Sequence, residues 1–175
     1  MAFKNRRLFI KIPSMTEGDR RAAMSQAARD ELERRLREFG GSLEEAYNNI
    51  GEAGGTSDWH DNAALDEVYR QVGLLEIYSS RIQRKLYKPE IIAPREETDD
   101  VGIGNKVALR FEGESEPEEF NLLGPADASV LPGAISFESP VGSALIGRQV
   151  GDEIEIEVNG QIHRIRIEGI RPGDF

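Results

Sequence analysis

The sequence has no cysteine. Disulfide bonds and thiol chemistry are therefore excluded, and a cysteine-free chain fits the reducing cytoplasm, where we expect this protein. No apolar run approaches the roughly 18 residues that a membrane-spanning helix requires, so we expect no membrane association. Only two histidines are present, His60 and His163, and they are too isolated to indicate zinc, which needs a cluster of ligands.

Positive charge is also scarce. The chain carries 22 lysines and arginines against 32 acidic residues, for a net charge of −10. Because Lys and Arg dominate phosphate binding, this balance argues against a protein that grips free nucleic acid with its whole surface, although a locally basic face remains open. The leader, residues 1–15, has one short apolar run, too interrupted by Lys11 and Pro13 for a secretory signal.

Two segments carry apolar residues in alternating steps of three and four. This spacing gives each helix the narrow apolar seam of a coiled coil. Two such helices joined by a short polar stretch are expected to fold back as an antiparallel hairpin. The seam residues are Leu32, Leu36, Phe39, Leu43, Ala46 and Ile50 in the first segment, and Leu65, Val68, Val72, Leu75, Ser79, Ile82 and Leu86 in the second.

The helix limits follow from local signals. We expect the first helix to begin between Thr16 and Asp19 and to be interrupted at Gly40-Gly41, since each glycine costs about 1 kcal/mol in a helix interior. Ser42 and Glu45 form a capping box from which the helix can restart. The second helix is expected from about Asp61 to Leu86, and Lys88-Pro89 ends it.

After residue 91 the pattern changes. Residues 92–105, rich in Pro, Gly and acids, indicate a linker, and a period of two then predicts β-strands. Asn159-Gly160 predicts a tight hairpin turn, and Pro140 to Gly147 a short helix. The expected strands are Lys106 to Phe111, Glu119 to Leu123, Ala134 to Glu138, Glu153 to Val158 and Gln161 to Ile170.

These patterns predict an α+β protein. Its parts are the leader at 1–15, a coiled-coil hairpin at 16–91 with an acidic tip at 56–62, the linker at 92–105, and an antiparallel β-sheet domain with a short helix at 106–175. We expect a monomer.

Two motifs resemble those of the GreA/GreB transcript-cleavage factors. One is the acid-x-x-acid-Asn-Ala element at Asp58 to Ala63, which Ile50 to Ala53 precedes. The other is Ala134 to Pro140, followed by Ala144 to Gly147 and Gly151-Asp152. The two motifs occur in the same order as in the family and are separated by the same distance along the chain. The similarity covers roughly residues 15 to 172.

The resemblance implies an FKBP-like C-terminal domain that docks on the rim of the secondary channel of bacterial RNA polymerase. The coiled coil would enter the channel and reach the catalytic centre. A factor of this family is not an enzyme by itself. It stimulates the polymerase's own cleavage of the 3′ end of backtracked RNA, so its partners are the polymerase and the nascent RNA within the complex.

The tip residues suit that chemistry. Two-metal phosphodiester hydrolysis uses a second ion that activates water, and Mg²⁺ prefers oxygen ligands. We expect Asp58 to carry most of the coordination of a Mg²⁺ ion shared with the polymerase, with no cofactor bound tightly by this chain. Asp61 would orient the water or support the ion, and Asn62 would orient the carboxylates. Capping of the second helix is the alternative role for both acids.

The resemblance also implies two contact regions. Glu138, Ser139 and Pro140 match the loop that the family places against the polymerase, and the same residues suit a helix cap with proline in the first turn. On the second helix, Arg81, Arg84 and Lys85 match basic positions that help to hold the RNA 3′ segment. The alternative is a solvated flank, with Arg34, Arg35 and Arg37 opposite and ion pairs to Glu31 and Glu33.

The tip also departs from the family pattern. Gly54, Gly55 and Ser57 stand where charged residues and a single glycine are usual. A regulator that occupies the channel and inhibits or competes, without efficient cleavage, is therefore the second hypothesis. A peptidyl-prolyl isomerase is the third, although few aromatic residues are available to line a proline pocket.

Overall fold

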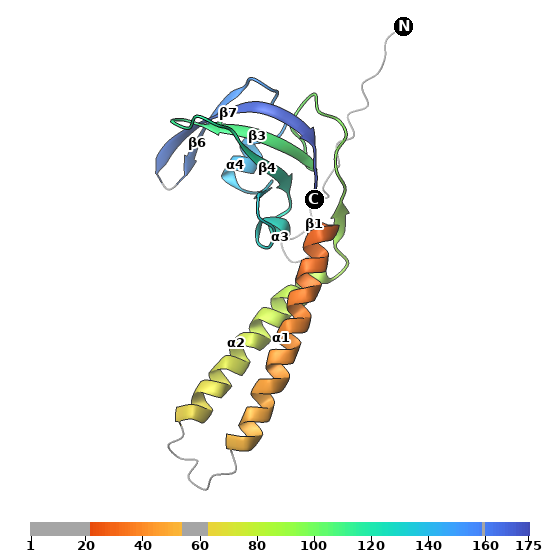
Figure 1. Cartoon of the computed structure of the whole chain (residues 1–175), viewed down its shortest axis with the longest axis vertical. Coiled ribbons are helices and arrows are strands. Elements are labelled where there is room, and N and C mark those ends of the chain that lie inside the picture. The colour runs from red at the N-terminus through yellow and green to blue at the C-terminus, as the bar shows by residue number, and fades with distance from the viewer. Residues whose placement is uncertain (1–21, 54–62, 159) are drawn as a thin grey trace, which may run out of the picture.

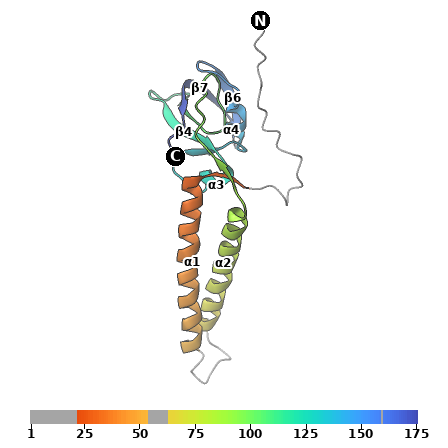
Figure 2. The same ribbon diagram turned by 90° about the vertical axis from the view of Figure 1, so that its right-hand side faces the viewer.

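The computed structural model describes residues 22–53, 63–158 and 160–175. Two long helices, α1 (Gln26–Ala53) and α2 (Ala63–Leu86), run antiparallel beside each other and project from a lobe built around a β-sheet (Figures 1 and 2). The helical hairpin expected from the sequence is therefore present. Among the described residues, no helix combines the length and apolar character needed to cross a membrane.

The seam predicted from the spacing faces inward. Leu32, Ala46, Val72 and Ile82 are buried. The side chains of Ile50 and Leu65 lie outside the described part, and the remaining seam residues are half-buried: Leu36, Phe39, Leu43, Val68, Leu75, Ser79 and Leu86. Because a fully buried Leu, Ile or Val contributes about 1.5–3 kcal/mol, this seam is the main force that pairs the helices.

Two expectations about the first helix are wrong. It begins at Gln26, because the chain at Ala23–Ser25 forms a short strand, β1, and the Ser25 Oγ then accepts a hydrogen bond from the Ala28 N–H at 3.1 Å as an N-cap. Thr16 to Asp19 lie outside the described residues. The helix also continues through Gly40-Gly41 without a break. Seam contacts on both sides of the glycines outweigh their poor helix propensity.

The second helix ends as expected. Its last residue is Leu86, and Lys88 adopts a positive φ of 48° before Pro89. The chain then forms β2 (Glu90–Ile92), which pairs in parallel with β1 in a two-stranded sheet. This small sheet joins the base of the hairpin to the lobe, and the sequence pattern did not indicate it.

The lobe contains a five-stranded sheet with the order β5-β4-β3-β7-β6. All neighbours are antiparallel except β4 and β5. The expected strands are confirmed, and the short helix α3 (Pro125–Ala128) was not anticipated. The strands are β3 (Asn105–Phe111), β4 (Glu118–Leu123), β5 (Ala134–Ser136), β6 (Glu153–Val158) and β7 (Gln161–Pro172).

One face of the sheet carries the core. Ile154 and Ile156 of β6 are buried, whereas the alternating Glu153, Glu155 and Glu157 are exposed, as the period of two predicted. The helix α4 (Pro140–Leu145) covers this core with the fully buried Leu145. Strands β6 and β7 meet through a two-residue connection with Gly160 at φ 78°; Asn159 lies outside the described residues.

The segment before β3 packs against the lobe. Asn105 is fully buried, and its Nδ2 donates to the carbonyl oxygens of Arg95 and Glu97, both at 3.0 Å. Its Oδ1 accepts from the Gly102 N–H at 2.8 Å. The Arg95 guanidinium also lies 2.6 Å from a carboxylate oxygen of Asp100. These bonds hold the chain between hairpin and sheet in one conformation.

Candidate functional site

The positions of the two helix ends locate the acidic segment. The chain leaves α1 at Ala53 and enters α2 at Ala63, and both points lie at the end of the hairpin remote from the sheet (Figure 1). Asp58, Asp61 and Asn62 belong to the nine intervening residues and lie outside the described part, so their coordination role stays a prediction. Within the described residues, no group of three or more acidic or histidine side chains forms a metal site.

The predicted RNA-contacting residues lie on the basal half of α2. None of Arg81, Arg84 and Lys85 forms an ion pair with a described carboxylate. The Arg81 guanidinium lies 6.0 Å from the centre of the Tyr78 ring, and the Arg84 Nε donates to the Ser80 carbonyl. Two of these cations therefore keep their charge available to a ligand.

Lys85 has a different neighbour. Its Nζ donates to the Ser129 Oγ at 3.3 Å, which links α2 to the end of α3 in the lobe. Sequence spacing placed Lys85 on the same stretch of helix as Arg81 but did not indicate this contact. Of the three predicted basic residues, Lys85 is the one that also contributes to the joint between hairpin and lobe.

Arginines of α1 form ion pairs with nearby glutamates, as expected for a solvated flank. Arg34 and Arg35 both pair with Glu31, at 2.7 Å each, and Arg34 also contacts Glu38. Hydrogen bonds from Arg34 and then Arg35 lower the pKa of Glu31 to about 2. Glu33 pairs with Arg29 at 3.0 Å. This face is a solvated flank of paired charges, and Arg37 has no ion pair among the described residues.

The predicted polymerase-binding loop is held rigidly. The Ser139 Oγ accepts from the Gly142 N–H at 3.0 Å and donates to the Ser136 carbonyl oxygen at 2.7 Å. A Cβ at Gly142 would lie 2.0 Å from that same carbonyl oxygen, so only glycine fits. Glu138 and Pro140 remain exposed on the capped loop. The predicted helix cap is confirmed, and contact of Glu138 and Pro140 with the polymerase stays a prediction.

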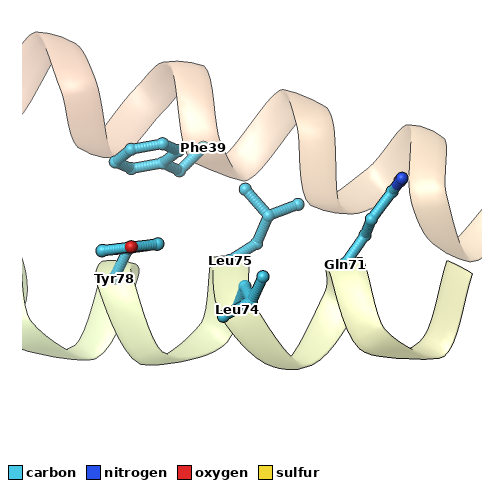
Figure 3. A pocket seen from close by; sticks show the side chains of 5 residues that line it. All are labelled: Phe39, Gln71, Leu74, Leu75 and Tyr78. Carbon is cyan, nitrogen blue, oxygen red and sulfur yellow. The ribbon is translucent and has the colours of Figure 1, made fainter. Parts of the chain in front are cut away.

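A shallow apolar hollow lies on the flank of the hairpin, where Phe39 of α1 faces Leu74, Leu75 and Tyr78 of α2 (Figure 3). The Phe39 and Tyr78 rings stack with centroids 6.2 Å apart. Leu74 and Tyr78 are 43% and 48% exposed although they adjoin the seam. The signal in the sequence is their spacing of four, beside the seam residue Leu75, which widens the apolar stripe on α2.

Comparison with known proteins finds sequence relatives in one family. Residues 96–172 match the family model described as transcription elongation factor, GreA/GreB, C-terminal. The transcription elongation factor GreA of Clostridium acetobutylicum is 36% identical over 115 residues, which cover 65% of this chain and 73% of the relative. GreA of Zymomonas mobilis is 30% identical over 148 residues, covering 85% and 87%.

Two solved structures align with most of the chain at low TM-scores. The GreA factor homolog 1 (Gfh1) protein of Thermus thermophilus aligns with 87% of this chain and 99% of its own, at 25% identity and a TM-score of 0.41. A GreA/GreB elongation factor from Nitrosomonas europaea aligns with 87% and 98%, at 22% identity and a TM-score of 0.37.

The sequence relatives define the class: this is a transcription elongation factor. The chain belongs to the GreA/GreB family.

Proposed function

We propose that this protein binds RNA polymerase through its sheet lobe and inserts the helical hairpin into the secondary channel. There it stimulates the polymerase's Mg²⁺-dependent cleavage of backtracked RNA. The observation that supports this most directly is the hairpin itself. The 28 residues of α1 give a length of about 42 Å, and the chain that carries Asp58 and Asp61 connects its far end to α2.

The chemistry requires the polymerase. Mg²⁺ keeps several waters and is held by few carboxylates, so one or two added acids decide whether a weakly bound second ion stays at the centre. Asp58 and Asp61 would supply those oxygens, with Asn62 holding their orientation. The factor then acts on an ion and a substrate that the polymerase holds, which is why no independent hydrolysis by the isolated chain is expected.

The lobe supplies the docking surface in this proposal. Glu138 and Pro140 are exposed on a loop fixed by the Ser139 cap, so little conformational freedom is lost when a partner binds. The cations Arg81 and Arg84 lie between this loop and the tip and lack carboxylate partners among the described residues, which suits contact with the RNA backbone.

The test is a halted, backtracked polymerase incubated with the protein and Mg²⁺, with the transcript followed over time. Shortened RNA that resumes extension supports the proposal, and Asp58→Ala is expected to abolish it while polymerase affinity stays within a few-fold. The matched control is Asp66→Asn, another acid in the first turn of α2. Slowed synthesis without shortening would instead identify a regulator that only occupies the channel. Turnover of a prolyl peptide would identify an isomerase.

A further inference from the structure

The hairpin meets the lobe at a small joint. Strand β1 leads directly into α1, and it contacts the lobe through α3 and β4 rather than by joining the five-stranded sheet. Figures 1 and 2 both place α3 beside this junction. The direction in which the hairpin points is therefore set by the few residues that pack here.

A buried carboxylate lies at the centre of the joint. Asp127 of α3 is fully buried, and its Oδ1 accepts a hydrogen bond from the Ser25 N–H at 2.9 Å, across 102 residues of sequence. Its Oδ2 accepts from the Gly124 N–H at 3.3 Å. Ser25 is the N-cap of α1, so the carboxylate faces the positive end of that helix's dipole. One side chain thus bonds the first residue of the hairpin to the lobe.

The backbone fits closely at the same point. A Cβ on Gly124 would lie 1.9 Å from the Ala23 carbonyl oxygen, so β1 rests directly against this glycine. Apolar side chains from both parts enclose the polar contact: Met24, Ala28, Leu32 and Ile82 from the hairpin and Ala126 from the lobe. Water is excluded, and a carboxylate oxygen that lost its partner here would be strongly disfavoured.

A small change of angle at this joint causes a large displacement at the far end of the hairpin. Over the roughly 42 Å of α1, a tilt of about 10° at Ser25 displaces the far end by about 7 Å. Reacting groups tolerate displacements of only about 1 Å before rates fall by about a hundredfold. A factor that must place acids in another molecule's active centre therefore needs a fixed base.

We propose that Asp127 is a positioning residue, whose carboxylate on the Ser25 N–H fixes the angle between hairpin and lobe and so the place of the acidic tip. The expected effect of Asp127 on RNA cleavage rests on the proposed function. Its structural content, a fixed angle, can be measured on the protein alone.

The angle is measured by double electron–electron resonance between spin labels at exposed positions, after Glu44→Cys on α1 and Glu116→Cys in the lobe. The chain has no other cysteine, so labelling is specific. We expect one narrow distance distribution. In Asp127→Asn, one oxygen becomes an NH2 donor, so the side chain can no longer accept from the Ser25 and Gly124 N–H groups together. The distribution should then shift or broaden by about 5 Å, the displacement of residue 44 for a 10° tilt.

Three further samples make the result interpretable. Labels at Asp30 and Asn48, both on α1, report whether the helix itself is intact and should give the same distance in every variant. Asp152→Asn is the matched control, since Asp152 accepts a backbone N–H from Gln149 at 2.9 Å away from the joint. If Asp127→Asn does not fold, Asp127→Ser removes the carboxylate with a smaller side chain that places no amide donor against the Gly124 N–H.

An unchanged distance distribution in a folded Asp127→Asn or Asp127→Ser protein overturns the proposal. A broadened distribution supports it, and cleavage should then fall at least about tenfold while binding to the polymerase stays within a few-fold. The two proposals fail separately. If the wild-type protein stimulates no cleavage, the proposed function is wrong, whereas the label distances still decide the role of Asp127.

Discussion

Replacing Gly40 and Gly41 with alanine should stabilise the protein. Both residues lie in the interior of α1, both are exposed, and a Cβ built on either one has no heavy atom within 4 Å. A new methyl group therefore causes no clash, and it restricts the unfolded chain. Alanine is favoured over glycine by about 1 kcal/mol in a helix interior, so the double substitution should add about 2 kcal/mol.

The assay is thermal unfolding followed by far-ultraviolet circular dichroism, which is dominated by the two long helices. For a chain of this size, 1 kcal/mol raises Tm by about 2–4 °C, so the double variant should gain about 4–8 °C. Gly142→Ala is the opposite control, because its Cβ would lie 2.0 Å from the Ser136 carbonyl oxygen and should lower Tm. A double variant with an unchanged or lower Tm would refute the reasoning that α1 is a continuous, unstrained helix here.

Three further predictions concern other parts of the chain. Asn105→Ala removes a fully buried amide that donates to two carbonyl oxygens and accepts from the Gly102 N–H, and it should cost about 3 kcal/mol. Urea unfolding measures this cost against Asn121→Ala, at a half-buried asparagine of β4. Glu31 has a pKa of about 2 in the folded protein against an ordinary 4.5, so the folded state binds fewer protons between those values. Its stabilising contribution should be complete above pH 4.5 and be lost as the pH falls towards 2; Glu31→Gln should flatten this part of the Tm profile, and a profile identical to wild type would contradict the pairing. Ser139→Ala removes the cap of α4 and should lower stability by about 1 kcal/mol and weaken polymerase binding, whereas Glu138→Ala should weaken binding alone.

The elements that sequence predicted well are those with local causes. The seam of Leu32 and Ile82 and the alternation of Ile154 with Glu155 each follow from which face of a single element meets the core. The cap at Ser139 and the stop at Pro89 depend on neighbours within a few residues. Such features do not require knowledge of what lies elsewhere in the chain.

The features that the sequence did not predict depend on contacts between segments that are distant in the chain. The start of α1 depends on β1 pairing with β2, two segments separated by the whole hairpin. Asp127 was not identified from the sequence, because its partner, the Ser25 N–H, is 102 residues away. Every residue except proline has a backbone N–H, so the spacing of residue types cannot reveal such a donor. The acidic tip was predicted by resemblance to a family motif, and the described residues fix only the two helix ends that flank it.

A bend of given angle displaces the tip of the hairpin more when it occurs at the base than when it occurs midway along α1. The contact of Gly124 with Ala23 and the buried Asp127 lie at the base, where a given tilt displaces the tip the most. Gly41 is 12 residues from the end of α1, about 18 Å, so the same bend there moves the end less than half as far. A bend at Gly40-Gly41 therefore disturbs the position of the tip less than an equal bend at the joint would. Asp127→Asn should accordingly reduce cleavage more than Leu43→Ala, although Leu43→Ala removes more apolar surface from the seam; the reverse order would show that tip placement is controlled within the hairpin.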